Sequence, residues 1–231
     1  MPADAAPRHP TPKPEPVPAP GPRPAPEPAP APVPVPGPEE SPSLRDRLVR
    51  TGVALVDAEG VQALTLREIA RRAGVSHGAP RRHFPTHLDL LSAIAREGFA
   101  ELGARVTAAD DPAAGPRARI EALARCYLDF ARQRGGMFEL MFRHDLLESG
   151  RLGLRDTSLP LFGHFAALVA AARPDTADPV TATGALWANL HGIAQLWRWG
   201  SLRLATGADD PAPLLAAALD AHLGPATGEA R

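Results

Sequence analysis

Positive charge gathers on one short stretch of this 231-residue chain. Between Thr65 and Leu88 there are five arginines against one glutamate, and His77, His83 and His87 lie in the same segment. The formal net charge of the whole sequence is −1, so the excess is local. A local cationic surface is what a contact with a phosphate backbone requires. The charge pattern therefore indicates a nucleic-acid contact in this segment.

Two short helices are expected to hold these residues. Thr65 with Glu68 three positions later is the pattern of a capping box and predicts a helix start, and Gly74 ends that helix. Ser76 is a second N-cap, opening a short helix over residues 76–84 that Pro85 stops. Two short helices with a glycine at the turn are the helix-turn-helix arrangement.

The remainder of the ordered chain also carries helical spacing. Apolar residues recur at intervals of three and four, which favours amphipathic helices that share a core over strands. The sequence therefore predicts an all-α fold, with helices over residues 43–58, 86–106, 117–134, 136–147, 158–172, 179–206 and 212–223.

Composition divides the chain into parts. Proline recurs at nearly every second position from Pro10 to Pro38, which predicts an extended, disordered tail over residues 1–42. A turn-rich break near Asp110–Pro116 marks a domain boundary. We expect a three-helix DNA-binding domain over 43–106 with its helix-turn-helix motif at 65–84, a helical bundle over 116–224, and a second disordered tail over 225–231.

Several function classes find no support. Cys126 is the only cysteine, which excludes a disulfide framework within the chain and a cysteine zinc cluster. No catalytic or phosphate-binding motif and no metal-ligand set is found, so no enzyme, cofactor or metal is expected. The absence of a long apolar run or a signal peptide argues against a membrane location and favours the cytoplasm.

The motif resembles the helix-turn-helix of the TetR/AcrR family of regulators. The match covers Gly60, Thr65, Arg67-Glu68-Ile69-Ala70, Ala73-Gly74-Val75-Ser76, Gly78 and His83-Phe84. The segment Trp187-Ala188-Asn189-Leu190-His191-Gly192, with Gly136–Phe142 upstream, resembles the subgroup that is named for a Trp-His-Gly signature in its regulatory domain. The resemblance implies a dimer that reads DNA, formed by the 179–206 helix and the last helix.

The resemblance also points to a set of DNA-binding residues. The second helix of such a motif enters the major groove, where its N-terminal residues read base edges. The candidates are Thr65, Arg67, Ser76, His77, Gly78, Ala79, Arg81, Arg82, His83 and His87. Relatives usually carry an aromatic residue at the position of Arg81 and a lysine at that of His87. Pro80 removes one amide, and we expect the helix to survive with a tightened start.

In this family the second domain usually holds a ligand pocket. Aromatic residues and a methionine at helical spacing are candidates for contacts with a small lipophilic effector, although such residues more often belong to the hydrophobic core. The candidate ligand-binding residues are Tyr127, Phe130, Phe138, Met141, Phe142, Phe162, Phe165, Trp187 and His191.

The sequence therefore predicts a ligand-responsive transcriptional regulator. It would act as a repressor, bind an inverted repeat in double-stranded DNA as a homodimer, and be released by its effector. The alternative is an all-helical small-molecule binding protein or enzyme whose helix-turn-helix no longer binds DNA, which the departures at Arg81 and His87 leave open. A proline-rich scaffold protein is a third hypothesis, and it rests on the tail alone.

Overall fold

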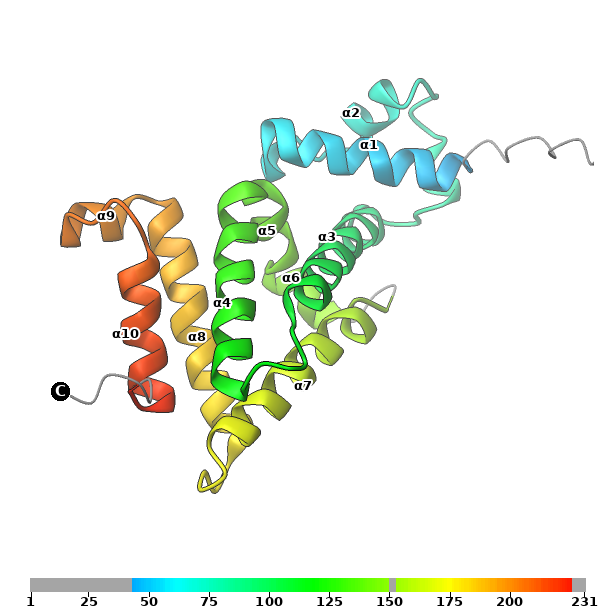
Figure 1. Ribbon diagram of the computed structural model, residues 1–231. Helices are drawn as coiled ribbons and strands as arrows, with labels where there is room; N and C mark the ends of the chain where they lie inside the picture. The colour runs from blue at the N-terminus through cyan, green and yellow to red at the C-terminus, as the bar shows by residue number, and fades with distance from the viewer. Residues whose placement is uncertain (1–42, 150–152, 226–231) are drawn as a thin grey trace, which may run out of the picture. The chain divides into compact units, whose positions relative to one another are not determined.

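The computed structural model describes residues 43–149 and 153–225, and the elements in these ranges are helices (Figure 1). The all-α prediction is confirmed. The predicted tails lie outside the described residues, except for Pro225. The elements are α1 (Leu44–Glu59), η1 (Val61–Ala63), α2 (Leu66–Arg72), η2 (Pro80–Arg82), α3 (His87–Ala109), α4 (Pro116–Gln133), α5 (Gly135–Met141), α6 (His144–Ser149), α7 (Leu154–Ala172), α8 (Pro179–Arg198), α9 (Ser201–Thr206) and α10 (Ala212–Leu223).

The first helices pack around one apolar centre. Leu48 and Leu55 of α1, Ile69 of α2 and Ile94 of α3 are fully buried together. Gly52 permits the close approach of α1 and α3, because a Cβ atom there would lie 2.2 Å from Cδ1 of Ile94. This core fixes α2 and the segment that follows it against α1, which leaves their polar faces toward solvent.

Helix α3 joins the two halves of the described chain. It starts at a capping box in which the Thr86 hydroxyl accepts from the Asp89 amide and the Asp89 carboxylate accepts from the Thr86 amide. Its N-terminal part packs on α1, and further along it packs on α4, α5 and α7 (Figure 1). Helix α3 therefore contacts both the N-terminal helices and the helices of the C-terminal part.

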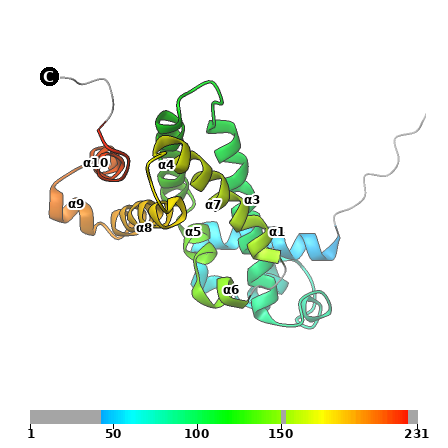
Figure 2. The ribbon, with the colours of Figure 1, turned by 90° about the horizontal axis from the view of Figure 1, so that it is seen from below.

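The C-terminal helices form a bundle in which α4, α7 and α8 pack on one another and α10 covers α8 (Figure 2). Its core is centred on Ile120, Leu186, Leu190, Leu215 and Leu219, which are almost completely buried. Leu186 and Leu190 are four positions apart in α8, and Leu215 and Leu219 are four positions apart in α10, as the amphipathic pattern requires.

Two predicted helices are interrupted. The helix expected over 136–147 breaks after Met141, because α5 packs on α1 and α3 while α6 takes a separate position against α3. The helix expected over 179–206 breaks at Gly200, whose φ of 77° lies in the left-handed region that ends helices. Helix α7 begins at the fully buried Leu154 rather than at Ser158.

Candidate nucleic-acid interface and ligand cavity

The predicted recognition helix over 76–84 is not an α-helix. Residues 77–79 form a turn, and only η2 (Pro80–Arg82) is helical, of the 3-10 type. The amides of Ala79, Arg82 and His83 each donate to a carbonyl three residues earlier. Pro80 has no amide to donate to Ser76, so the first α-helical hydrogen bond cannot form, and the proline does more than tighten the start of the helix.

The predicted DNA-binding residues nevertheless lie at the surface. Thr65, Arg67, Ser76, His77, Gly78, Arg81, Arg82, His83 and His87 are exposed, and Ala79 is half-buried. Beneath them Phe84 is 1% exposed and anchors the segment to the core. His87 is partly engaged, because its Nε2 lies 2.6 Å from the carbonyl oxygen of Leu64. That nitrogen holds the start of α3 against the loop before α2.

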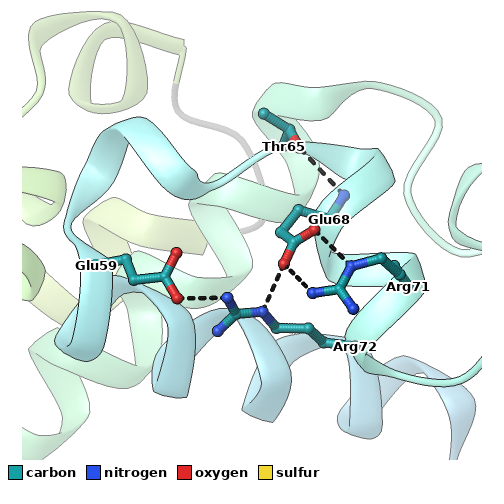
Figure 3. A network of polar contacts seen from close by, with 5 residues as sticks. All are labelled: Glu59, Thr65, Glu68, Arg71 and Arg72. Carbon is teal, nitrogen blue, oxygen red and sulfur yellow. Dashed lines mark hydrogen bonds and ion pairs between the residues drawn. The ribbon is translucent and has the colours of Figure 1, made fainter.

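The arginines of the motif differ in their partners. Arg67, Arg81 and Arg82 make no ion pair within the described residues, whereas Arg71 and Arg72 both bind Glu68 (Figure 3). Arg72 also reaches Glu59 at the end of α1. The cationic surface that remains available therefore centres on Arg67, Arg81 and Arg82.

The predicted capping box at Thr65 forms only by half. The Thr65 hydroxyl accepts a hydrogen bond from the Glu68 amide at 3.1 Å. The Glu68 carboxylate does not return to the Thr65 amide, because it accepts hydrogen bonds from Arg71 and Arg72. Two guanidinium groups outcompete one neutral amide for the same carboxylate.

One basic residue beside this surface was missed in the sequence. The guanidinium carbon of Arg45 lies 5.2 Å from the centre of the Phe84 ring, which places α1's first turn beside the reading segment. A cation–π contact across almost forty residues of sequence has no local signal, so only the fold reveals it.

An apolar cavity of about 230 Å³ lies between α3, α4, α7 and α8. Ser158, Tyr127 and Trp187 are the lining residues whose side chains carry a polar atom, and no charged residue is among the lining residues. The lining residues are Phe99, Leu102, Val106, Leu123, Ala124, Tyr127, Phe142, Ser158, Leu159, Leu161, Phe162, Phe165, Trp187 and Leu190.

The structure separates the predicted ligand-binding residues into two groups. Five of them line the cavity: Tyr127, Phe142, Phe162, Phe165 and Trp187. Phe130, Phe138 and Met141 do not, because their side chains are fully buried in the core between α1, α3 and α5. The α3 part of the wall, Phe99, Leu102 and Val106, was missed, since its helical spacing is the same as that of a core face.

His191 lies behind the cavity wall. Its Nδ1 is 2.8 Å from the Tyr127 hydroxyl, and its ring stacks on Phe138 at 5.3 Å between centroids. Burial lowers the pKa of His191, and burial also raises the pKa of the Tyr127 hydroxyl well above its usual range. The pair is therefore neutral near pH 7, and it adds no charge beside the cavity.

Among the described residues no group of three or more His, Cys, Asp and Glu side chains could hold a metal ion. Across residues 43–149 and 153–225, no helix has the length and apolar character needed to cross a membrane.

Comparison with curated proteins finds relatives through part of their length. The chain is 37% identical over 84 residues to the HTH-type transcriptional regulator BetI of Rhizobium meliloti, which is 36% of this chain and 41% of the relative. It is 28% identical over 116 residues to the nucleoid occlusion factor SlmA of Aliivibrio fischeri, 49% of this chain and 59% of that protein. The chain thus spans about half the length of the curated relatives that it matches.

Solved structures match over most of their length. A protein of unknown function from Rhodococcus sp. RHA1 is 28% identical with a TM-score of 0.67, over 81% of this chain and 97% of that one. The multidrug binding protein EbrR, complexed with imidazole, is 28% identical with a TM-score of 0.53, over 79% of this chain and 96% of that one. The arrangement of helices is therefore shared with these proteins.

Family models match both halves of the chain. The model described as bacterial regulatory proteins, tetR family, matches residues 48–94, which contain the helix-turn-helix. The model described as tetracyclin repressor-like, C-terminal domain, matches residues 120–222, which contain the helices around the cavity. Because the two matches together span more than half of the chain, the protein belongs to the TetR family of bacterial regulatory proteins.

Proposed function

We propose that this protein is a ligand-responsive, DNA-binding transcriptional regulator that acts as a repressor. The observation that carries the proposal is the exposed cationic surface formed by Arg67, Arg81 and Arg82, none of which makes an ion pair within the described residues. Guanidinium groups with free donors suit phosphate oxygens and guanine edges. The membership of the TetR family and the match of its N-terminal model to residues 48–94 support the same function.

The reading element is the turn and 3-10 helix between Ser76 and Phe84. Its small residues, the exposed Gly78 and the half-buried Ala79, allow the backbone to approach base edges closely, and the exposed Arg81 and Arg82 follow Pro80. One such short element covers few base pairs. Two copies about 34 Å apart, one turn of DNA, would read an inverted repeat and give useful affinity.

A stripe of small and apolar residues on α8 supports a dimer. Ala185, Ala188, Gly192 and Leu196 of α8, and Trp199 directly after it, follow one another at intervals of three and four residues and are exposed or half-exposed. On the neighbouring α10, Ala216, Ala217 and Ala221 are exposed. Uncharged small residues at this spacing let helices approach closely, so two copies of α8 and α10 form the four-helix interface.

The effector that we propose is a neutral, lipophilic small molecule. The cavity wall carries no charge that would compensate a buried ionic ligand, and burying an unpaired charge is very costly. A dry cavity on the order of 150 Å³ accommodates benzene, so about 230 Å³ leaves room for a somewhat larger ring system. That the similar protein EbrR is a multidrug binding protein supports a ligand of this kind.

Several finer assignments belong to this proposal. The DNA-binding domain extends over 43–106, the regulatory domain over 116–224, and the protein works in the cytoplasm without catalysing a reaction. We also place it in the Trp-His-Gly subgroup. Trp187 and His191 support this, since their rings lie one helical turn apart with centroids 6.0 Å apart, beside the cavity.

A gel-shift assay with the DNA that flanks the protein's own coding region tests the function. We expect retention of an inverted repeat that falls steeply when salt is raised from about 50 to about 200 mM. A lipophilic compound that enters the cavity should release the DNA only if it binds the DNA-incompetent arrangement more tightly. Tight binding of a small molecule without retention of any duplex would favour the alternative, a binding protein whose motif has lost its DNA contact.

A further inference from the structure

Glu68 occupies the centre of the polar network on α2 (Figure 3). Its Oε2 accepts from Nε of Arg71 at 2.8 Å, and its Oε1 accepts from a terminal nitrogen of Arg71 and from Nε of Arg72, both at 2.6 Å. The other end of Arg72 binds Glu59. Two carboxylates therefore neutralise two guanidinium groups within one cluster.

The cluster keeps its charges across the physiological pH range. The hydrogen bonds from Arg71 and then from Arg72 lower the pKa of Glu68 to about 2. The Glu68 carboxylate is therefore ionised wherever the protein is folded under ordinary conditions, and the four residues together carry no net charge. A DNA phosphate that approaches the protein would meet a cluster without net charge at Glu68 and a cationic surface at Arg81 and Arg82.

Arg71 occupies a position that would otherwise belong to the cationic surface. It follows Arg67 by four residues, so the two side chains project from the same face of α2. The side chain of Arg71 is 64% exposed, but its guanidinium is turned onto Glu68 and not outward. Arg72 differs, since its side chain is half as exposed and has Glu59 as a second anchor.

From this arrangement we infer that Glu68 is a specificity-determining residue, which withholds Arg71 from the DNA backbone and so keeps sequence-independent binding weak. The inference rests on the proposed function. Contacts with phosphates add affinity for every sequence and carry no sequence information. A regulator competes with a large excess of non-specific sites, so one phosphate contact fewer raises the ratio of specific to non-specific binding.

The test compares Glu68→Gln with Glu97→Gln on a random-sequence duplex. Both variants remove one negative charge, and Glu97 is an exposed residue of α3 that makes no ion pair within the described residues. We expect Glu68→Gln to bind the random duplex roughly tenfold more tightly per protomer at about 0.1 M salt, with a salt slope steeper by about 0.9 per protomer. Glu97→Gln should stay within about twofold of the wild type.

The double variant Glu68→Gln/Arg71→Ala identifies the arginine that is released. It restores the charge balance, and Arg72 keeps Glu59, so we expect wild-type affinity and slope for the random duplex. Persistence of the Glu68→Gln gain in the double variant would overturn the assignment to Arg71. Circular dichroism of each variant confirms that α2 and the bundle remain folded.

The remaining outcomes separate this inference from the proposed function. If the wild type retains an inverted repeat but Glu68→Gln and Glu97→Gln bind random DNA alike, the role of Glu68 is overturned and the regulator function stands. If the wild type binds no duplex at any salt concentration, the proposed function fails and the inference fails with it.

Discussion

At the level of single residues, whether an exposed arginine can bind DNA depends on the carboxylates beside it. Arg81 and Arg82 make no ion pair with a carboxylate among the described residues. Arg71 and Arg72, in contrast, both form ion pairs with Glu68. A free guanidinium keeps all of its donors for a ligand. Removal of a free arginine should therefore cost affinity for DNA without a cost to folding.

Arg82→Ala should weaken binding to the inverted repeat by about 1–3 kcal/mol if Arg82 contacts a base, or lower the salt slope by about 1 if it contacts a phosphate. Helicity and dimerisation should remain unchanged, because the side chain is exposed. Titration of labelled DNA at several salt concentrations measures both quantities. Arg125→Ala, on the exposed face of α4, is the matched control, and equal affinity of the two variants would show that the reading surface lies elsewhere.

His191 predicts how stability depends on pH. Burial lowers its pKa below the ordinary value of 6.5, so the unfolded chain binds a proton that the folded chain does not. The contribution of this residue to stability is therefore present above pH 6.5 and is lost as the pH falls below it. In the protonated ring both nitrogens are donors, so Nδ1 could then only donate to the Tyr127 hydroxyl that lies 2.8 Å away.

We expect the Tm to fall between about pH 7.5 and pH 5.5, and His191→Gln to reduce that fall, since glutamine does not titrate there. Thermal unfolding followed by circular dichroism at both pH values measures the difference. An undiminished fall in the variant would mean that His191 is not the group responsible.

At the level of elements, the corner between α4 and α5 connects the regulatory helices to α1. A terminal nitrogen of Arg134 lies 3.1 Å from Asp57 of α1 and 3.0 Å from Glu101 of α3. Gly136 packs directly on the last turn of α1, where a Cβ atom would lie 2.3 Å from the carbonyl oxygen of Val56. The obstructing atom belongs to the backbone and cannot rotate away.

Gly136→Ala should therefore destabilise the fold by about 1–3 kcal/mol through overpacking. Gly163→Ala in α7 is the matched control, because a Cβ there meets nothing within 4 Å. An alanine inside a helix should instead stabilise by about 0.5–1 kcal/mol. Denaturant unfolding curves give both values, and similar midpoints for the two variants would contradict the close contact between α5 and α1.

At the level of the whole molecule, the cavity between the helices is the space that an effector would fill. Ala124→Leu adds a larger side chain to a wall position that is 1% exposed, and should reduce the affinity of a neutral naphthyl dye by tenfold or more, on the order of 1.4 kcal/mol. Quenching of the tryptophan emission by the dye reports binding, since Trp187 lines the same space. Unchanged affinity would place the dye outside the cavity.

The proposed dimer interface on α8 also concerns the whole molecule. Ala188→Glu introduces a charge into the stripe on α8 that we propose to be buried between two copies, and an unpaired buried charge is strongly unfavourable. We expect a monomer in sedimentation velocity experiments and much weaker binding to the inverted repeat. Ala100→Glu, at an exposed position of α3, should behave as the wild type does, and a dimer in both variants would exclude this interface.

Much of the architecture follows from local patterns in the sequence. The bounds of α10 agree with its prediction, and α1 and α4 differ from theirs by one residue at each end, because periodic apolar positions and the caps at Ser43 and Gly60 are local signals. The exposure of the predicted reading residues follows in the same way, from polar residues on the outer face of a recognisable motif.

The tertiary structure decided what depends on partners far away in sequence or on competition between neighbours. Pro80 replaced the expected α-helix of the reading segment by a 3-10 turn, and the Glu68 carboxylate bonded to Arg71 and Arg72 in place of the Thr65 amide. Phe130, Phe138 and Met141 became part of the core, whereas Phe99 and Leu102 line the cavity. Apolar periodicity shows that a side chain faces inward. Whether it meets another side chain or an open space depends on how the helices pack, and that is not encoded within any single helix.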